Sequence, residues 1–230
     1  MKQTLAEYRA FFREFRETFH TTGAIAPSGK SLCRATVRPM SEHQGPKRVL
    51  EVGSGTGAVT REIVKHIHAG DQFDAVELNE RFVGVLNYLF DNETQFKKVK
   101  DYSRVLHMAV QELSTEDKYD YIVCCVPFNN FSVALTREIF RHMLKLLKPG
   151  GTLSFFEYLW IRGFKVLLAN KTERKRLTGI AQVLGRYLRQ YEFKCDTAWV
   201  NMPPAMVHHL RFDPEAEPRP RKRRKRKAKS

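Results

Sequence analysis

A glycine-rich loop follows a short apolar segment near residue 50 and limits the folds that the chain can adopt. Residues 48–52 have the character of a β-strand, and the chain then reads Gly53-Ser54-Gly55-Thr56-Gly57 before a helical pattern over residues 58–67. A strand that leads through glycines into a helix allows its backbone to approach a ligand closely. The loop therefore predicts a ligand site at the end of a strand.

Strand-like and helix-like segments alternate along most of the chain. This alternation predicts an α/β fold with a mainly parallel sheet and helices on both faces. A turn at Lys148-Pro149-Gly150-Gly151 is expected to end one of the helices. The predicted strands are residues 48–52, 73–78, 105–108, 119–126, 152–158, 193–200 and 206–212. The predicted helices are residues 1–20, 30–38, 58–67, 81–90, 133–147 and 165–190.

Length and charge predict one folded domain with two terminal extensions. A chain of 230 residues can bury a sizeable core. The net charge is +15, but nine basic residues lie within residues 219–229, which leaves about +6 (15 − 9) for the remainder. We expect an N-terminal helix and substrate-side segment over residues 1–40, a ligand-binding domain over 41–212, and a disordered basic tail over 213–230.

The cysteines and the hydropathy pattern favour a cytosolic protein. The four cysteines are Cys33, Cys124, Cys125 and Cys195, and their spacing fits neither a disulfide framework nor a metal site. Buried, reduced thiols are expected, and no metal is predicted. The N-terminal segment is charged, and charges also interrupt the apolar residues 153–168. We therefore expect no bilayer-spanning segment, so that any membrane contact would be peripheral.

Two families use similar glycine loops. A dinucleotide-binding fold would have Gly-x-Gly-x-x-Gly, whereas this chain has Gly53-x-Gly55-x-Gly57 with Glu51 just before it. The second pattern resembles the first motif of class I methyltransferases. That resemblance implies a Rossmann-like fold with seven strands, an antiparallel last strand, and S-adenosylmethionine as the cofactor. It also implies that the glycines pack under the methionine and ribose, while Glu51 lies near the cofactor's ammonium group.

Other cofactor contacts follow from the positions of strand ends. Glu77 ends the second predicted strand, where a carboxylate can accept both ribose hydroxyls, and Asn79 is expected beside the adenine. In the family, an acidic residue often faces the adenine amine after the third strand. Ala109 stands there in this chain, so apolar packing from Ala109 and Val110 is expected, with Gln111 as a polar substitute.

The end of the fourth predicted strand points to the methyl acceptor. Amine-directed methyltransferases place a small polar residue, a proline and an aromatic there, and this chain has Cys125, Pro127 and Phe128. Ribosomal RNA adenine dimethyltransferases have asparagine where Cys125 stands, which disfavours an RNA adenine acceptor. Tyr158 is predicted either to contact the acceptor amine or to be a structural tyrosine.

A closer resemblance rests on the order of several motifs. They are a phenylalanine-rich first helix, a Thr-Gly-Ala-Ile-Ala-Pro-Ser loop (residues 22–28), the Pro127 turn and an Asn-Met-Pro-Pro-Ala turn (residues 201–205). Together these resemble bacterial phospholipid N-methyltransferases, which methylate phosphatidylethanolamine or ornithine lipids, over roughly residues 8–212. The chain departs from that family's pattern at Ala109, Cys125 and Glu157.

The resemblance implies a peripheral enzyme on the cytoplasmic face of a bacterial inner membrane, and we expect it to be a monomer. The membrane and substrate contacts would come from Phe11, Phe12, Phe15, Phe19 and Ser28, and basic segments would attract anionic lipid. These segments include the tail and the basic residues 165, 171 and 174–176 of the predicted long helix. Two alternatives stay open. One is an RNA methyltransferase whose tail binds nucleic acid, and the other is a binding module with a vestigial cofactor site.

Overall fold

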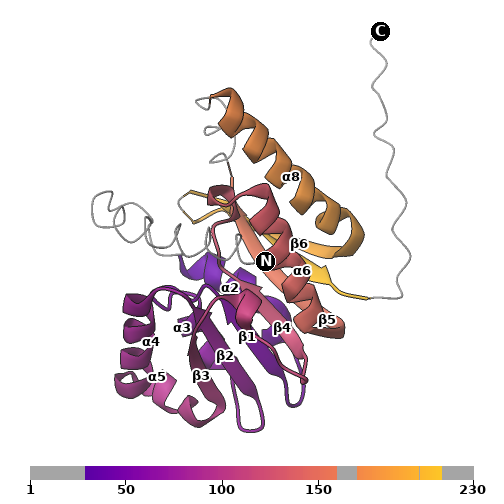
Figure 1. Ribbon diagram of the computed structural model, residues 1–230. Helices are drawn as coiled ribbons and strands as arrows, with labels where there is room; N and C mark the ends of the chain where they lie inside the picture. Colours follow the sequence, from indigo (N-terminus) through magenta and orange to yellow (C-terminus); the bar gives the residue numbers. More distant parts are fainter. Residues whose placement is uncertain (1–28, 160–169, 202, 214–230) are drawn as a thin grey trace.

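The computed structural model describes residues 29–159, 170–201 and 203–213 (Figure 1). The predicted helix over residues 1–20, the loop over 22–28 and the basic tail lie outside these described residues. The predicted roles of Phe11, Phe12, Phe15, Phe19 and Ser28 therefore stay predictions. Among the helices in the described ranges, none is both long and apolar enough to cross a bilayer.

A seven-stranded sheet with the order β3-β2-β1-β4-β5-β7-β6 forms the centre of the fold. The first five strands are parallel to one another, and β7 is antiparallel to both of its neighbours. The predicted mainly parallel sheet with an antiparallel last strand is therefore confirmed. The strands are β1 (Arg48–Val52), β2 (Gln72–Glu77), β3 (Ser103–His107), β4 (Tyr119–Cys124), β5 (Leu147–Tyr158), β6 (Glu192–Ala198) and β7 (Ala205–Arg211).

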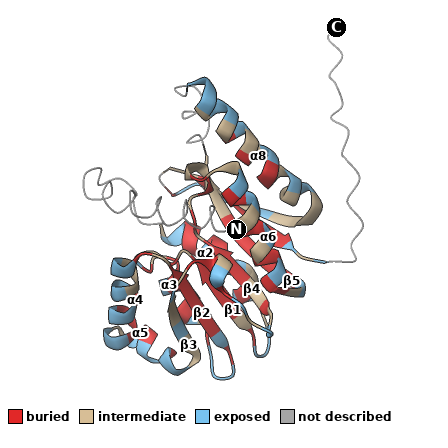
Figure 2. Cartoon of the chain, viewed as in Figure 1, coloured by how far each residue is buried: buried red, intermediate tan, exposed pale blue. Residues whose placement is uncertain are grey.

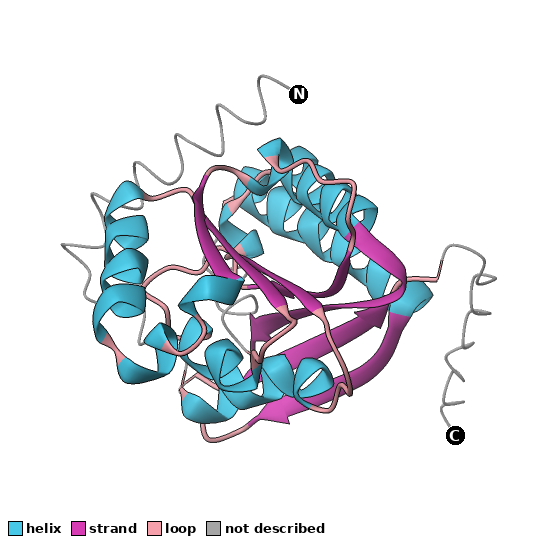
Figure 3. Ribbon diagram, turned by 90° about the horizontal axis from the view of Figure 1, so that it is seen from below, coloured by secondary structure: helices cyan, strands magenta, loops and turns pink. Residues whose placement is uncertain are grey.

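Helices cover both faces of the sheet (Figure 3). One face is packed by α2 (Lys30–Ser41), α3 (Thr60–Ile63), α4 (Glu80–Asn92) and α5 (Thr94–Lys97). The other is packed by α6 (Val133–Leu146) and α8 (Lys171–Tyr191). Successive strand residues point to opposite faces, so Val49 packs with the first group and Leu50 with the second. The central strands are buried on both sides, as Figure 2 shows.

Several boundaries differ from the sequence predictions. The helix expected over residues 58–67 has only four α-helical residues and continues as a 3₁₀ turn, Val64–His66. The turn expected at residues 148–151 lies inside β5, where the pairing with β4 shifts register and Gly150 N–H donates to Phe212 O. Helix α2 belongs to the core because Leu32, Val37 and Met40 are buried. The predicted boundary at residue 40 lies one residue before the end of this helix.

Candidate cofactor and acceptor site

The glycine loop is shaped by three residues with left-handed backbone. The φ angles are +77° for Gly53, +56° for Gly55 and +83° for Gly57. A Cβ on Gly53 would lie 2.7 Å from Val126 Cγ1, and one on Gly57 would lie 2.7 Å from Leu89 Cδ1, whereas a Cβ on Gly55 would meet nothing within 4 Å. Gly53 and Gly57 thus allow close packing. Gly55 leaves an open cradle that a side chain would fill.

Glu77 joins the glycine loop to the segment that follows β2. Its Oε2 accepts a hydrogen bond from Gly55 N–H at 2.8 Å, and its Oε1 accepts one from Asn79 N–H at 2.8 Å. Burial raises the pKa of this carboxyl. Each carboxylate oxygen has a second lone pair, which suits hydroxyl donors of a ligand. Asn79 is the N-cap of α4, because its side-chain oxygen accepts a hydrogen bond from Arg81 N–H.

Glu51 is a fully buried carboxyl on β1, on the face covered by α2 and α3. Its Oε2 accepts a hydrogen bond from Thr60 Oγ1 at 2.7 Å, and Cys125 Sγ lies 4.0 Å from its Oε1. Burial raises the pKa of Glu51 from its ordinary value of 4.5 to about 7. A nearby cation, such as a ligand's ammonium group, would favour the ionised form.

We expect this buried carboxyl to make the stability of the ligand-free protein fall as the pH rises from about 4.5 to 7. In that window the unfolded chain has already released the proton that the folded protein retains, so ionisation favours unfolding. At 1.36 kcal/mol per pH unit, the loss is about 3 kcal/mol. The difference in unfolding free energy between Glu51→Gln and wild type should therefore increase across this window and level off above it. Parallel stability curves for the two proteins would contradict the assignment.

The segment after β3 begins in the core and continues as a 3₁₀ turn. Ala109 and Val110 are both fully buried within the core cluster, so neither presents exposed surface to an adenine in this conformation. Gln111 follows in a 3₁₀ turn, and both polar atoms of its side-chain amide are buried without a hydrogen-bond partner among the described residues. An amide in that state fits a polar ligand edge better than the two apolar side chains do. In the sequence, Gln111 was considered as an adenine contact only because it follows Ala109 and Val110.

The loop after β4 lies directly against the glycine loop. Cys125 N–H donates to Val52 O at 2.8 Å, and Val126 is the residue that a Cβ on Gly53 would strike. Burial raises the pKa of the Cys125 thiol well above its ordinary value, so the group is a neutral thiol rather than a base. Pro127 then leads into a 3₁₀ turn over Phe128–Asn130. The residues predicted for the acceptor site and for the cofactor site are thus in contact.

Arg176, on α8, binds the segment that follows β4, residues 125–131, which we call the acceptor loop because the acceptor site is predicted there. The sequence did not reveal this role. Arg176 donates from Nη2 to Asn129 O at 2.9 Å and from Nη1 to Phe131 O, while Glu173 pairs with the same guanidinium, at 2.8 Å from Nε. The predicted attraction of this residue to anionic lipid has to be reconsidered, because its donors are used inside the protein. The guanidinium therefore fixes the backbone of residues 129–131 to α8.

Tyr158 lies at the carboxyl end of β5, on the face covered by α2. It packs beside a small cluster that includes Leu32 and Ala205, and its ring contacts Phe156 edge-on at 5.6 Å between centroids. The side chain is half-buried and is therefore partly supported by the core. Its contact with an acceptor amine stays a prediction.

Two residues that are far apart in the sequence, Gly29 and Asn201, are hydrogen-bonded at this end of the sheet. Gly29 N–H, directly after the Thr-Gly-Ala-Ile-Ala-Pro-Ser loop, donates to Asn201 Oδ1 at 2.8 Å, and Asn201 Nδ2 donates to Pro203 O at 2.8 Å. A Cβ on Gly29 would lie only 2.8 Å from Asn201 Oδ1. The Asn-Met-Pro-Pro-Ala turn thus fixes the point where the N-terminal segment joins the domain.

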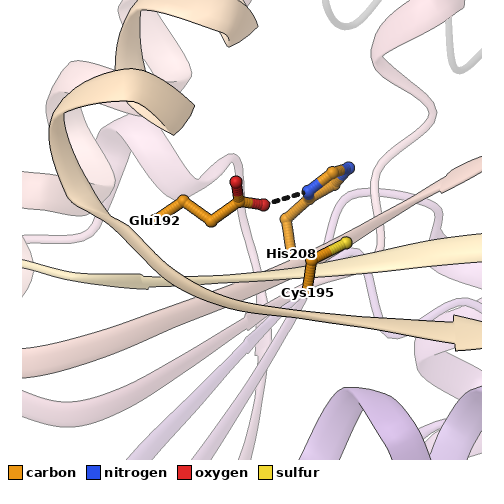
Figure 4. A group of neighbouring side chains, drawn as sticks. All are labelled: Glu192, Cys195 and His208. Atoms are coloured by element: carbon orange, nitrogen blue, oxygen red, sulfur yellow. Dashed lines mark hydrogen bonds and ion pairs between the residues drawn. The ribbon is translucent and has the colours of Figure 1, made fainter. Parts of the chain in front are cut away.

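A separate Glu–Cys–His group lies where α8 meets the outer strands (Figure 4). Ligand-type atoms of Glu192, Cys195 and His208 lie within 4.8 Å of one another. Glu192 Oε1 is 2.6 Å from His208 Nδ1, closer than the roughly 3.3 Å expected between two ligands of a tetrahedral zinc ion. These two side chains are hydrogen-bonded to each other and link the start of β6 to β7. Cys195 is exposed, contrary to the expectation that every cysteine is buried.

Comparisons with known proteins agree with the geometry of the site. A family model described as a methyltransferase domain matches residues 50–153. The chain is 28% identical to an ornithine lipid N-methyltransferase of Singulisphaera acidiphila over 158 residues, which is 68% of this chain and 81% of that protein. It is also 27% identical to polyamine aminopropyltransferase 1 of Aquifex aeolicus, over 49% of this chain and only 41% of that protein.

Solved structures show the same fold. An O-methyltransferase from Bacillus cereus, solved in complex with SAH, superposes with a TM-score of 0.60 at 13% identity, covering 88% of this chain and 91% of that one. The strand order is that of the class I methyltransferase fold. Residues 50–153 therefore match a methyltransferase domain, and the described part of the chain has the class I fold of S-adenosylmethionine-dependent methyltransferases.

Proposed function

We propose that this enzyme methylates the head-group amine of a membrane lipid, either phosphatidylethanolamine or a related aminolipid such as an ornithine lipid. The observation that carries the proposal is the similarity to an ornithine lipid N-methyltransferase, which extends over 68% of this chain and 81% of that relative. The hydrogen bond between Gly29 and Asn201 supports it, because it joins the residue directly after one motif of that resemblance, residues 22–28, to the first residue of another, residues 201–205.

The residues of the site fit the cofactor. Gly55 provides a cradle with space beside its backbone, Glu77 offers carboxylate lone pairs near it, and the orphaned amide of Gln111 offers a polar contact. Glu51 would accept the positive ammonium end, which offsets the desolvation of its carboxylate. S-adenosylmethionine, when bound, supplies a methyl group already activated on a sulfonium. The protein would orient the acceptor amine and exclude water from the site.

The acceptor amine would approach from the loop after β4. This loop touches the glycine loop at Val126, so a nitrogen held by the backbone near Pro127 would lie beside the cofactor site. Cys125 contributes a small neutral group there, and Tyr158 would contact the ammonium of the head group. The amine must be unprotonated when it attacks, because its lone pair forms the new bond.

The remaining parts of the proposal concern the membrane. We infer a monomer that attaches peripherally to the inner face of the cell membrane. The phenylalanine-rich segment over residues 1–20 and the basic segments would provide the contacts. The alternative role for the basic tail is to bind nucleic acid.

Lipid analysis of a suitable host tests the proposed activity. In a bacterium that makes phosphatidylethanolamine but no methylated derivatives, we expect expression of the chain to produce mono-, di- or trimethylated species detectable by mass spectrometry. The same host carrying Gly55→Arg should lack them. A second host that makes ornithine lipids separates the two head groups. If wild-type protein binds the cofactor but changes neither lipid class, the proposal is wrong and RNA becomes the next acceptor to test.

A further inference from the structure

The turn between β6 and β7 presents two adjacent apolar side chains to solvent. Trp199 is 68% exposed and Val200 is 90% exposed. The other exposed large hydrophobic residues in the described ranges are Tyr88, at 64%, and Val85, at 38%, both on α4. Exposing an indole and a branched aliphatic side chain together is costly in water, which indicates a contact surface.

The turn is held in place by hydrogen bonds on both sides. Asn201, next to Val200, accepts from Gly29 N–H and donates to Pro203 O, and Leu159 N–H donates to Pro204 O at 2.7 Å. Trp199 and Val200 are therefore carried by an anchored segment. This arrangement lowers the entropy lost when the two side chains enter a contact.

The turn lies at the same end of the sheet as the cofactor site. Strand β6 is antiparallel to β7, which is antiparallel to β5, so β6 runs parallel to β5 and its carboxyl end lies with those of β1 and β4. Helix α8 follows β5 and starts at this end, as Figure 1 shows. Its first turns expose Lys171, Arg174 and Lys175, while the nearby Glu173 is paired with Arg176. Apolar and positive groups are thus presented at one end of the molecule.

We propose that Trp199, Val200, Lys171, Arg174 and Lys175 form a docking surface for an anionic lipid bilayer. Tryptophan favours the boundary between head groups and acyl chains, because one part of its ring system is apolar and its N–H stays hydrated. Lysine and arginine are attracted to the negative surface potential. This proposal rests on the proposed function, since docking at this end would bring lipid head groups to the end of the sheet where the cofactor site lies. It adds residues outside 1–28 to the proposed membrane contacts.

Vesicle binding without cofactor or aminolipid tests the surface. Wild-type protein should co-sediment with vesicles of phosphatidylglycerol and phosphatidylcholine. Trp199→Ala with Val200→Ser should weaken this binding at least 10-fold at both low and high salt. Lys171→Gln with Arg174→Gln and Lys175→Gln should weaken it 10- to 100-fold at low salt, with less effect at high salt because of screening.

Matched variants control for lost apolar area and lost charge. Tyr88→Ala removes an aromatic ring that is 64% exposed on α4, and Arg186→Gln with Arg189→Gln removes exposed charges at the far end of α8. Both should bind vesicles like wild type. Wild-type binding by the Trp199 and Val200 variant, or equal losses in the controls, would overturn the docking surface. Binding to RNA in place of vesicles would also overturn it.

A soluble acceptor separates this inference from the proposed activity. The Trp199 and Val200 variant should methylate a monomeric short-chain aminolipid at the wild-type rate while it loses activity on vesicles. If wild type methylates no aminolipid but the variants still lose vesicle binding, the docking surface stands and the proposed function fails. If wild type is active and the variant acts normally on vesicles, the docking surface alone is wrong.

Discussion

Replacing Gly55 with arginine is expected to abolish cofactor binding, with a loss of at least 100-fold in affinity. The backbone at this position has a φ of +56°, and the Cβ would enter the open cradle beside the glycine loop. The arginine side chain would fill space that the cofactor needs and would place a cation beside a site that receives a sulfonium. Left-handed backbone adds a strain of about 1 kcal/mol for a residue with a Cβ. Titration calorimetry with S-adenosylhomocysteine measures the loss directly.

Gly45 offers a matched control for this substitution. It also has a left-handed backbone, with a φ of +85°, and a Cβ there would likewise meet nothing within 4 Å. It precedes β1 instead of following it, so it lies at the opposite end of that strand from the cofactor loop. Gly45→Arg imposes similar strain and the same added charge, and its affinity for the cofactor should stay within about threefold of wild type. Near-wild-type affinity in Gly55→Arg would show that the cradle does not hold the cofactor.

The sequence predicted the elements better than it predicted their ends. The alternation of strands and helices and the glycine loop were sufficient to predict the sheet and the positions of two residues in it. Glu77 ends β2, and Glu51 is the penultimate residue of β1. The turn at residues 148–151 was read from Pro149 and two glycines, but Gly150 N–H and Gly151 O both pair with Phe212. Pairing with a strand that lies far along the chain cannot be read from local residues, so β5 starts earlier than predicted.

The site was harder to predict where burial decides a residue's role. Ala109, Val110 and Gln111 are consecutive, and only the path of the 3₁₀ turn determines that the first two enter the core while the amide of the third is left without a partner. The role of Arg176 likewise could not be predicted from the sequence. In the sequence this residue is one of several basic residues on a long helix, whereas in the fold its guanidinium is directed to two carbonyls of the acceptor loop.

Replacing Arg176 with methionine is expected to lower kcat for aminolipid methylation 10- to 100-fold while leaving cofactor affinity unchanged. The guanidinium bonds the carbonyls of Asn129 and Phe131, and the neighbouring loop contacts Gly53 through Val126. Without that clamp the loop backbone can shift, and a displacement of about 1 Å at an acceptor can cost a factor of 100 in rate. Arg176→Lys should recover only part of the rate, because an ammonium lacks the planar fork that reaches both carbonyls.

The adjacent Arg174 provides the control for charge. Its side chain is exposed, so Arg174→Met removes the same positive charge from the same helix without freeing the loop. With a monomeric short-chain aminolipid as acceptor, which needs no bilayer, Arg174→Met should have wild-type kcat while Arg176→Met does not. A KM effect without a kcat effect in Arg176→Met would indicate that the loop binds the lipid but does not orient it. Equal kcat in the two variants would show that the clamp has no part in positioning the amine, and cofactor titration confirms that each variant is folded.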